Sequence, residues 1–380
     1  MELSSHAQTY IEHQREEALK LLLELARIPG PSNHEEKRAE FCKTWLIQNG
    51  AAGTYTDSAL NVIYPVNCSG RNSIVVFMAH SDVVFPDTEE LPLRTENGRI
   101  YCPGIGDNSA NIIALLTVIK YINENKFKPK NTGLLFVINS GEEGLGNLKG
   151  CRKIIEEYGS RITEFYAIDG SNAKITNSAV GSKRYRVEVI TEGGHSFRKF
   201  GNRNAIACLA SLLTSLYEIK VPEQGKTTYN VGTISGGTSV NTIAQQADML
   251  YEIRSDSRES LATMERHFNA AIDFYRTKGI TVNVELAGDR PCMGDVDPAR
   301  QQALMDKAAA AVRKYFRKEP IFESGSTDCN IPFSVGIPSV ALGCYFGENS
   351  HTREEYLEIE SLLPGLQLAF SLVLEYFSYS

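Results

Sequence analysis

The sequence lacks the features that mark membrane, secreted and nucleic-acid-binding proteins. No apolar run reaches the length of a membrane span, and the first 30 residues carry charges throughout, unlike a signal peptide. No window interleaves Lys and Arg with aromatic residues, and the formal net charge is -7. The eight cysteines are scattered without a CxxC pair, which predicts free thiols in a reducing compartment. We therefore expect a soluble, cytoplasmic protein with neither nucleic-acid nor membrane partners.

What is present is an alternation of strand and helix patterns along the first half of the 380 residues. Near-continuous apolar runs predict strands that are buried on both faces, at residues 72–80, 133–140 and 164–170. Helical patterns lie at 111–125 and 146–159, and an earlier helix to about Asn49 has a predicted capping box of Asn33 and Glu36. This alternation predicts an α/β fold with a doubly wound, mostly parallel sheet.

The pattern changes after about Gly181. Residues 182–288 follow the order β-α-β-β-α-β, which is the split unit of a ferredoxin-like sandwich. A helix, a buried strand and a final helix follow this segment. We therefore expect one α/β domain built from residues 1–181 and 289–380, with an α+β domain inserted at 182–288.

Candidate site residues follow the predicted strands of the α/β domain. Ligands of open α/β sheets bind outside the carboxyl ends of the strands. The segments "MAHSD", "IGDNSAN", "NSGEEG", "AIDG" and "ENSH" place polar residues after strands or at the start of a helix: His80, Asp82, Asp107, Glu142, Glu143, Asp169 and His351. Each has an ordinary explanation alone, since Asp107 can cap a helix, Asp169-Gly170 is a turn dipeptide and a Glu-Glu pair usually lies in a solvated turn.

Together, two histidines and at least four carboxylates predict a metal site. So many carboxylates at one sheet edge would repel one another without a cation. Imidazole and carboxylate ligands suit Zn²⁺, with Co²⁺ or Mn²⁺ as alternatives, and the number of ligands fits two ions that share a carboxylate. His80 and Asp82 are two residues apart on an extended segment and face the same way, so Asp82 can orient the imidazole.

These motifs, in this order, resemble the co-catalytic zinc exopeptidases, which include peptidase T, carboxypeptidase G and the aminoacylases. The resemblance covers nearly the whole chain and implies a catalytic domain with an inserted lid or dimerisation domain. It implies that Asp107 bridges two metal ions, that one ion also binds His80 and Asp169, and that the other binds Glu143 and His351. Glu142 is then the general base, and Asp82 is the carboxylate that orients His80. A base of this kind must not itself be a metal ligand, because it has to accept the proton of water and deliver it to the leaving amine.

The resemblance also assigns residues in the inserted domain. His195, in "EGGHSFRKFG", matches a histidine that hydrogen-bonds the tetrahedral intermediate and is commonly supplied by the partner chain of a homodimer. Arg254 matches an arginine that binds a substrate carboxylate, and Asn241 resembles an asparagine that contacts substrate. The segment 325–330, "GSTDCN", resembles a loop that lines the substrate site. From spacing alone, His195 would be a turn histidine and Arg254 an exposed strand charge.

The branch of the family is left open by two features. An aspartate at position 169 is typical of the dipeptidase and tripeptidase branch, whereas "GDRPCMG" at 288–294 resembles deacylase relatives. We expect a di- or tripeptide aminopeptidase nearest the peptidase T-like branch. The alternatives are an N-acyl-amino-acid amidohydrolase, a carboxypeptidase of the same family, or a non-catalytic binding protein on this fold, which would lack a ligand or the base.

Overall fold

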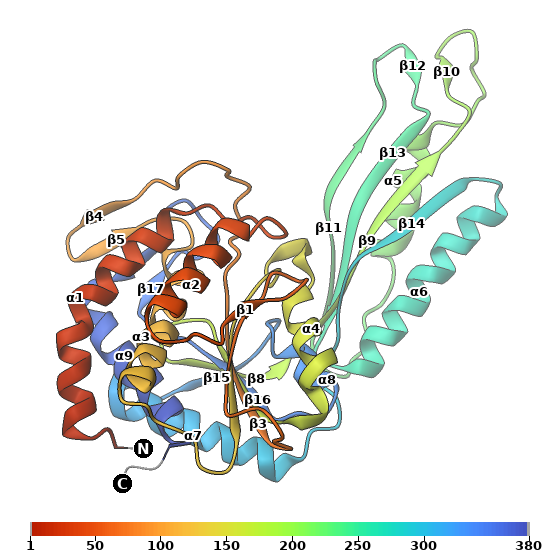
Figure 1. The fold of residues 1–380 in the computed structure, drawn as a ribbon. Coiled ribbons are helices and arrows are strands. Elements are labelled where there is room, and N and C mark those ends of the chain that lie inside the picture. The colour runs from red at the N-terminus through yellow and green to blue at the C-terminus, as the bar shows by residue number, and fades with distance from the viewer. Residues whose placement is uncertain (1, 378–380) are drawn as a thin grey trace. The chain divides into compact units, whose positions relative to one another are not determined.

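The computed structural model describes residues 2–377 of the chain, which divide into two units (Figure 1). The first unit runs up to Ala179 and resumes at Gly294, and the second unit spans Val180–Met293. Among the described residues, no helix is both long enough and apolar enough to cross a membrane.

The first unit is built on an eight-stranded sheet of order β1-β2-β6-β3-β7-β16-β8-β15. Its strands are β1 Tyr55–Thr56, β2 Val62–Val66, β3 Ile74–His80, β6 Gly133–Asn139, β7 Ile162–Ile168, β8 Lys174–Ala179, β15 Ile321–Gly325 and β16 Ser339–Leu342. The central strands β6, β3, β7 and β16 run parallel, whereas β1, β2 and β8 introduce antiparallel pairs. Every residue of β3 and β6 is buried, as the apolar runs predict.

Helices cover both faces of this sheet, which makes it doubly wound. The helices of the unit are α1 Ser5–Arg27, α2 Glu36–Gln48, α3 Asn111–Glu124, α4 Lys149–Tyr158, α7 Pro298–Phe316, α8 Asn330–Ser334 and α9 Leu362–Leu374. One layer consists of α1, α3, α7 and α9, which pack on one another and on one face of β3 through Val75, Phe77 and Ala79. A small sheet of order β17-β18-β5-β4 lies in the same unit, with β4 Arg94–Glu96, β5 Arg99–Tyr101, β17 Gly347–Glu348 and β18 Tyr356–Glu358.

The second unit is a ferredoxin-like sandwich. Its elements are β9 Gly181–Ile190, β10 Gly194–His195, α5 Ala205–Tyr217, β11 Thr227–Gly236, β12 Thr242–Ile243, β13 Gln246–Ser255, α6 Arg258–Thr277 and β14 Thr281–Arg290. The four long strands pair antiparallel in the order β11-β13-β9-β14, and α5 and α6 pack on this sheet around their own core. The predicted α/β fold with a ferredoxin-like insertion is therefore confirmed.

One local prediction is wrong. Asn33 and Glu36 do not form a capping box, because α2 begins two residues later, with Glu35 at its N-cap position and no side-chain cap. Glu35 instead accepts a hydrogen bond from the Asn33 N–H at 2.8 Å, and Asn33 adopts a left-handed φ of 73°. The carboxylate of Glu35 is thereby turned into the protein, where it meets the segment after β6.

Candidate metal centre

Three neighbouring parallel strands deliver polar residues to one edge of the large sheet. His80 is the last residue of β3, and Asp169 directly follows β7. Glu142 and Glu143 follow β6, which ends at Asn139. Because β6, β3 and β7 are adjacent and parallel, their carboxyl ends lie side by side.

Asp107 lies between the two histidines. Its Oδ1 is 3.1 Å from Nε2 of His80, and its Oδ2 is 3.3 Å from Nε2 of His351. Nε2 of His351 is also 2.9 Å from Oε1 of Glu143. On the other side, Nε2 of His80 is 3.8 Å from Oδ1 of Asp169. Two groups of donor atoms therefore meet at one carboxylate, with His80 and Asp169 in the first group and Glu143 and His351 in the second.

This arrangement fits the coordination of metal ions. Ligand atoms of His80, Asp107 and Glu143 all lie within 4.8 Å of one another. Zinc bonds of about 2.0–2.2 Å place neighbouring tetrahedral donors roughly 3.3–3.6 Å apart. The donor separations of 2.9–3.8 Å scatter around that spacing. Nitrogen and carboxylate oxygen donors are also the set that zinc and similar divalent ions prefer.

The electrostatics of the cluster favour positive charge. Burial by itself would lower the pKa of His80, but hydrogen bonds to Asp107 and Asp82 outweigh it and raise that pKa well above its usual value. Hydrogen bonds to Asp107 and Glu143 raise the pKa of His351 to about 11. Burial raises the pKa of Asp169 to about 6, and repulsion from Asp107 and Glu143 adds to this effect. The carboxylates thus stabilise the positively charged form of the neighbouring histidines, as expected of a site that binds cations.

Asp82 supports the centre through the main chain as well as through His80. Nδ1 of His80 is 3.1 Å from the main-chain oxygen of Asp82 and 3.5 Å from its Oδ1. The Asp82 carboxylate also accepts hydrogen bonds from the N–H groups of Glu142 and Glu143, at 3.0 and 2.8 Å. Ser32 Oγ donates a further one at 2.7 Å. One buried carboxylate therefore ties the turn that carries both glutamates to the end of β3.

Two glutamates with no distinctive sequence signal hold the loops of the cluster. Glu35 accepts a hydrogen bond from the Gly141 N–H at 2.8 Å, directly before Glu142. Glu355 accepts hydrogen bonds from three main-chain N–H groups of the segment that carries Asp107. Glu355 is buried, whereas its neighbour Glu354 is exposed. The sequence does not indicate which of two adjacent glutamates is the buried one.

The segment 325–330 contributes a buried residue near the end of β6. The side chain of Asp328 is 2% exposed, and its Oδ2 accepts a hydrogen bond from Nδ2 of Asn139 at 2.7 Å. Burial raises the pKa of Asp328 to about 7. This side chain therefore contacts the last residue of a central strand.

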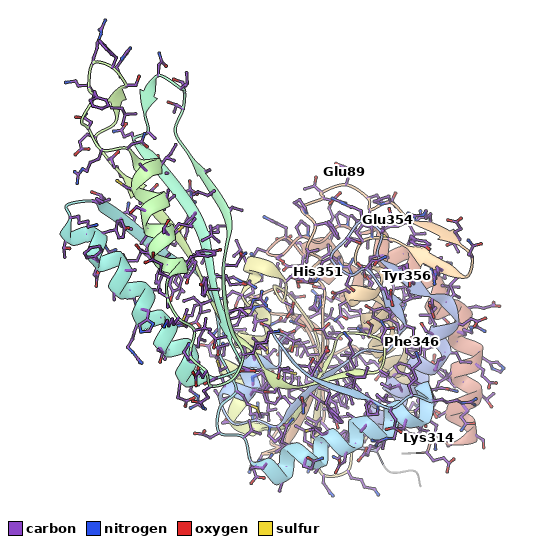
Figure 2. All side chains as sticks on the ribbon, turned by 180° about the vertical axis from the view of Figure 1, so that it is seen from behind. Glu89, Lys314, Phe346, His351, Glu354 and Tyr356 are labelled. Carbon is purple, nitrogen blue, oxygen red and sulfur yellow. The ribbon has the colours of Figure 1, made fainter. Side chains whose placement is uncertain are left out.

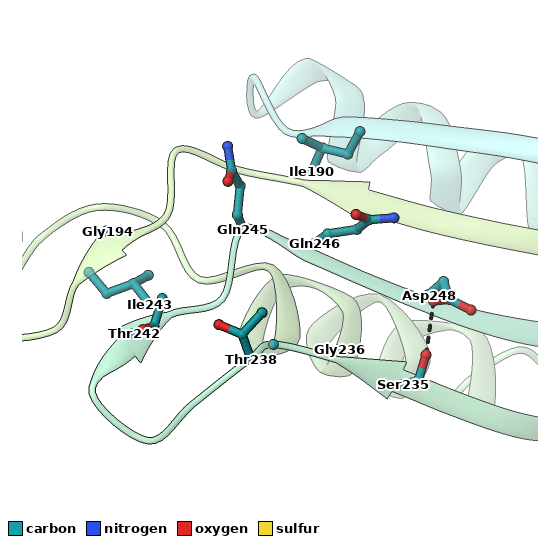
Figure 3. A pocket seen from close by; sticks show the side chains of 11 residues that line it. Ile190, Gly194, Ser235, Gly236, Thr238, Thr242, Ile243, Gln245, Gln246 and Asp248 are labelled. Atoms are coloured by element: carbon teal, nitrogen blue, oxygen red, sulfur yellow. Dashed lines mark hydrogen bonds between the residues drawn. The ribbon is translucent and has the colours of Figure 1, made fainter.

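In the second unit, His195 and Asn241 lie side by side. His195 pairs with Thr242 in the short ladder of β10 and β12, and the Ser196 N–H donates to the main-chain oxygen of Asn241 at 2.9 Å. Nδ1 of His195 accepts a hydrogen bond from the Phe197 N–H at 3.3 Å, which leaves Nε2 as the donor. The adjacent residues Gly194 and Thr242 line a groove of about 580 Å³ that continues along Ser235–Thr238 to Asp248 (Figure 3).

Arg254 lies in the four-stranded sheet of the second unit, which is separate from the β10–β12 pair. It is the ninth residue of β13, which begins at Gln246 beside the strand pair that carries His195. At about 3.4 Å per residue, the eight steps from Gln246 to Arg254 span about 27 Å. The guanidinium of Arg254 donates to both carboxylate oxygens of Glu252, at 2.7 and 3.0 Å. The structure therefore does not bring Arg254 together with His195 and Asn241 within one chain.

Comparison with known proteins identifies the family. The model of peptidase family M20/M25/M40 matches residues 76–375. A Bacillus subtilis protein of uncharacterised function, YqjE, is 25% identical over 376 residues, which cover 94% of this chain and 97% of that protein. Carboxypeptidase G2 of a Pseudomonas species is 22% identical over 83% of this chain and 76% of its own length.

The fold is shared with a solved structure of this class. The crystal structure of a tripeptidase from Staphylococcus aureus superposes with a TM-score of 0.75 at 24% identity, over 95% of this chain and 98% of the other. The family match covers most of the large sheet and the whole second unit, together with the residues of the candidate metal centre from His80 to His351. The chain belongs to peptidase family M20/M25/M40 and is a metallohydrolase.

Proposed function

We propose that this protein is a two-metal exopeptidase that hydrolyses the amide bond of short peptides, with di- and tripeptide aminopeptidase activity as the first choice. The observation that carries this proposal is the position of Asp107, whose two oxygens face two different imidazoles. A carboxylate in that position can bridge two ions. The similarity in fold to a tripeptidase supports the choice of short peptides.

Five residues would hold the ions in this proposal. Asp107 is shared, His80 and Asp169 complete one site, and Glu143 and His351 complete the other. Zinc is the preferred ion, with cobalt and manganese as alternatives. Divalent ions at such a site lower the pKa of water and polarise a substrate carbonyl.

Glu142 is the proposed general base. It is 5% exposed and adjacent to Glu143, and the N–H groups of both residues are held by Asp82. From this position Glu142 would accept the proton of the attacking water and pass it to the leaving amine. The two adjacent glutamates thereby take different roles, one as a ligand and one as a base.

The second units of two chains would contact one substrate. His195 would donate from Nε2 to the developing oxyanion, beside Asn241, and Arg254 would bind a substrate carboxylate through its planar fork. A tripeptide is at most about 11 Å long, whereas Arg254 lies about 27 Å along β13 from Gln246, the end of that strand next to the β10–β12 pair that carries His195. One chain therefore cannot offer both residues to the same substrate, which supports a homodimer formed through the second unit.

The test uses one tripeptide with three distinguishable residues. Purified protein is incubated with Leu-Gly-Phe, with its N-acetylated form and with N-acetyl-leucine, each with zinc, cobalt or manganese. We expect leucine to be released first from the free tripeptide. Release of phenylalanine first would instead identify a carboxypeptidase, the activity of the Pseudomonas relative, and cleavage of only the acetylated substrates would identify a deacylase.

A further inference from the structure

Glu355 is a buried carboxylate in a strongly charged segment. It follows Arg353 and Glu354 and precedes Tyr356, and its side chain is only 1% exposed. Figure 2 labels His351, Glu354 and Tyr356 along this segment. The exposed Glu354 pairs with Arg94 at 2.6 Å, whereas Glu355 has turned into the protein. A buried anion must be compensated by hydrogen bonds or opposite charge.

Three main-chain N–H groups partly provide that compensation, since burial still raises the pKa of Glu355 to about 7. The Glu355 carboxylate accepts hydrogen bonds from Gly104 at 2.6 Å, Gly106 at 3.0 Å and Asp107 at 2.9 Å. Main-chain N–H groups of one short segment that converge on a carboxylate in this way form an anion-binding nest. The nest is thus filled by a carboxylate of the chain itself.

The glycines of the nest are required by its geometry. Gly104 has a left-handed φ of 74°, which other residues adopt only with strain. A Cβ on Gly106 would lie 2.4 Å from the ring of Tyr345. A side chain at either position would therefore strain or displace the segment whose N–H groups point towards Glu355.

The nest connects the two chain segments that meet at Asp107. Its last N–H belongs to Asp107 itself, and Glu355 is four residues after His351. The main-chain oxygen of Glu355 also accepts the Cys102 N–H at 3.2 Å, so main chain and side chain both hold the two segments together. Asp82 does the same on the other side of the cluster, where it accepts the N–H groups of Glu142 and Glu143.

We propose that Glu355 is a positioning residue for the metal centre, which sets the place of Asp107 relative to His351 and thereby the affinity for both ions. The proposal rests on the proposed function, because it requires Asp107 to be the shared ligand. Glutamine at position 355 has nearly the same shape but only one acceptor oxygen, and its NH₂ group would oppose an N–H of the nest. Loss of such a supporting group typically weakens metal binding by about 10–100-fold.

The experiment compares the wild type with Glu355→Gln, Glu355→Asp and the adjacent control Glu354→Gln. Zinc affinity is measured by competition with a chelating dye, and the visible absorption spectrum of the cobalt-loaded protein reports ligand geometry. The melting temperature of each metal-free variant is recorded beside them. We expect Glu355→Gln to bind both ions about 10–100-fold more weakly and to change the cobalt spectrum, while Glu354→Gln behaves as wild type.

Glu355→Asp keeps the charge but is one methylene shorter, so we expect an intermediate loss of zinc affinity. This variant replaces Glu355→Gln if Glu355→Gln does not fold. A lower melting temperature with unchanged zinc affinity and cobalt spectrum would show that Glu355 only stabilises the fold, and would overturn the inference. Failure of the wild type to bind two ions per chain would overturn the proposed function as well. The wild-type stoichiometry therefore separates the two failures.

Discussion

At the scale of single residues, the central feature is a carboxylate that two imidazoles share. Hydrogen bonds to Asp107 and Glu143 raise the pKa of His351 to about 11. The pKa of His80 is raised well above its usual value by Asp107 and Asp82, despite burial that opposes protonation. The His351 imidazole is therefore protonated on both nitrogens at pH 8 in the absence of metal, and it must lose the proton of its coordinating nitrogen to bind. The raised pKa of His80 acts in the same direction.

Metal binding is accordingly expected to release at least about one proton per chain at pH 8, the one held by His351. Asp169 does not contribute there, since its pKa of about 6 leaves it ionised. The affinity for zinc should rise with pH, because protons compete with the metal for His80 and His351. Calorimetric titration in buffers of different ionisation enthalpy measures the proton release.

The matched variants for this prediction are His351→Ala and His267→Ala. His267 is exposed on α6 of the second unit and should leave the proton release unchanged. His351→Ala should release about one proton fewer than the wild type and lose one ion of the two. Equal proton release from His351→Ala and the wild type would contradict the assignment of His351 as a ligand.

At the scale of elements, the sequence predicts the strands and helices that are marked by a pattern within their own residues. The apolar runs locate β3, β6 and β7, and the residues after each strand follow from where the runs end. The pairing of β8 with β16 is antiparallel and could not be predicted, because partner choice depends on distant segments. The small sheet of β4, β5, β17 and β18 has no clear pattern in the sequence, because its strands are only two or three residues long.

The sequence does not indicate which carboxylates support the site through hydrogen bonds to the main chain. Asn33 and Glu36 have the spacing of a capping box, yet the residue at the N-cap position is Glu35, whose side chain accepts a hydrogen bond from the Gly141 N–H. Glu354 and Glu355 are chemically identical neighbours, and only the nest at Gly104, Gly106 and Asp107 distinguishes them. Such roles depend on contacts between residues more than 100 positions apart, which no local pattern contains.

The turn after β6 gives a prediction at this scale. A Cβ on Gly146 would lie 2.5 Å from the Cα of Gly141, whereas a Cβ on Gly144 would meet nothing within 4 Å. Gly146→Ala should therefore displace the backbone that carries Glu142, and a shift of about 1 Å can cost on the order of 10²-fold in rate. The measurement is kcat at full metal occupancy.

Gly144→Ala is the control in the same turn. Its φ of 48° makes alanine cost about 1–2 kcal/mol in stability, but the substitution does not push against Gly141. We expect its kcat to stay close to that of the wild type. Equal losses of kcat in the two variants would show that the turn tolerates no side chain at all, and that the contact with Gly141 is not the cause.

At the scale of the whole molecule, the second unit exposes several large apolar side chains. Phe197, Phe200 and Val240 are 87%, 92% and 103% exposed near the strands that carry His195. The edge strand β11 adds Ile234, which is 52% exposed. Exposed apolar groups of this kind commonly mark protein interfaces.

If the proposed homodimer forms through this surface, Ile234→Glu should weaken self-association. Burying an unpaired charge in an interface costs more than about 1.4 kcal/mol, so the dimer dissociation constant should rise at least about tenfold. Ile321→Glu is the control, because Ile321 is 57% exposed on the edge strand β15 of the first unit. Sedimentation velocity over a concentration series measures both, and equal behaviour of the two variants would contradict association through β11.

The most direct test of the account is the activity of Glu142→Gln at full metal occupancy. The matched control is Glu90→Gln, in the exposed pair Glu89-Glu90. Both variants are loaded with zinc, their ion content is measured, and hydrolysis of Leu-Gly-Phe is followed. We predict that Glu142→Gln keeps two ions per chain and loses about 10²–10⁴-fold in kcat, while Glu90→Gln retains wild-type activity. Wild-type kcat in Glu142→Gln would contradict the assignment of one glutamate as ligand and its neighbour as base.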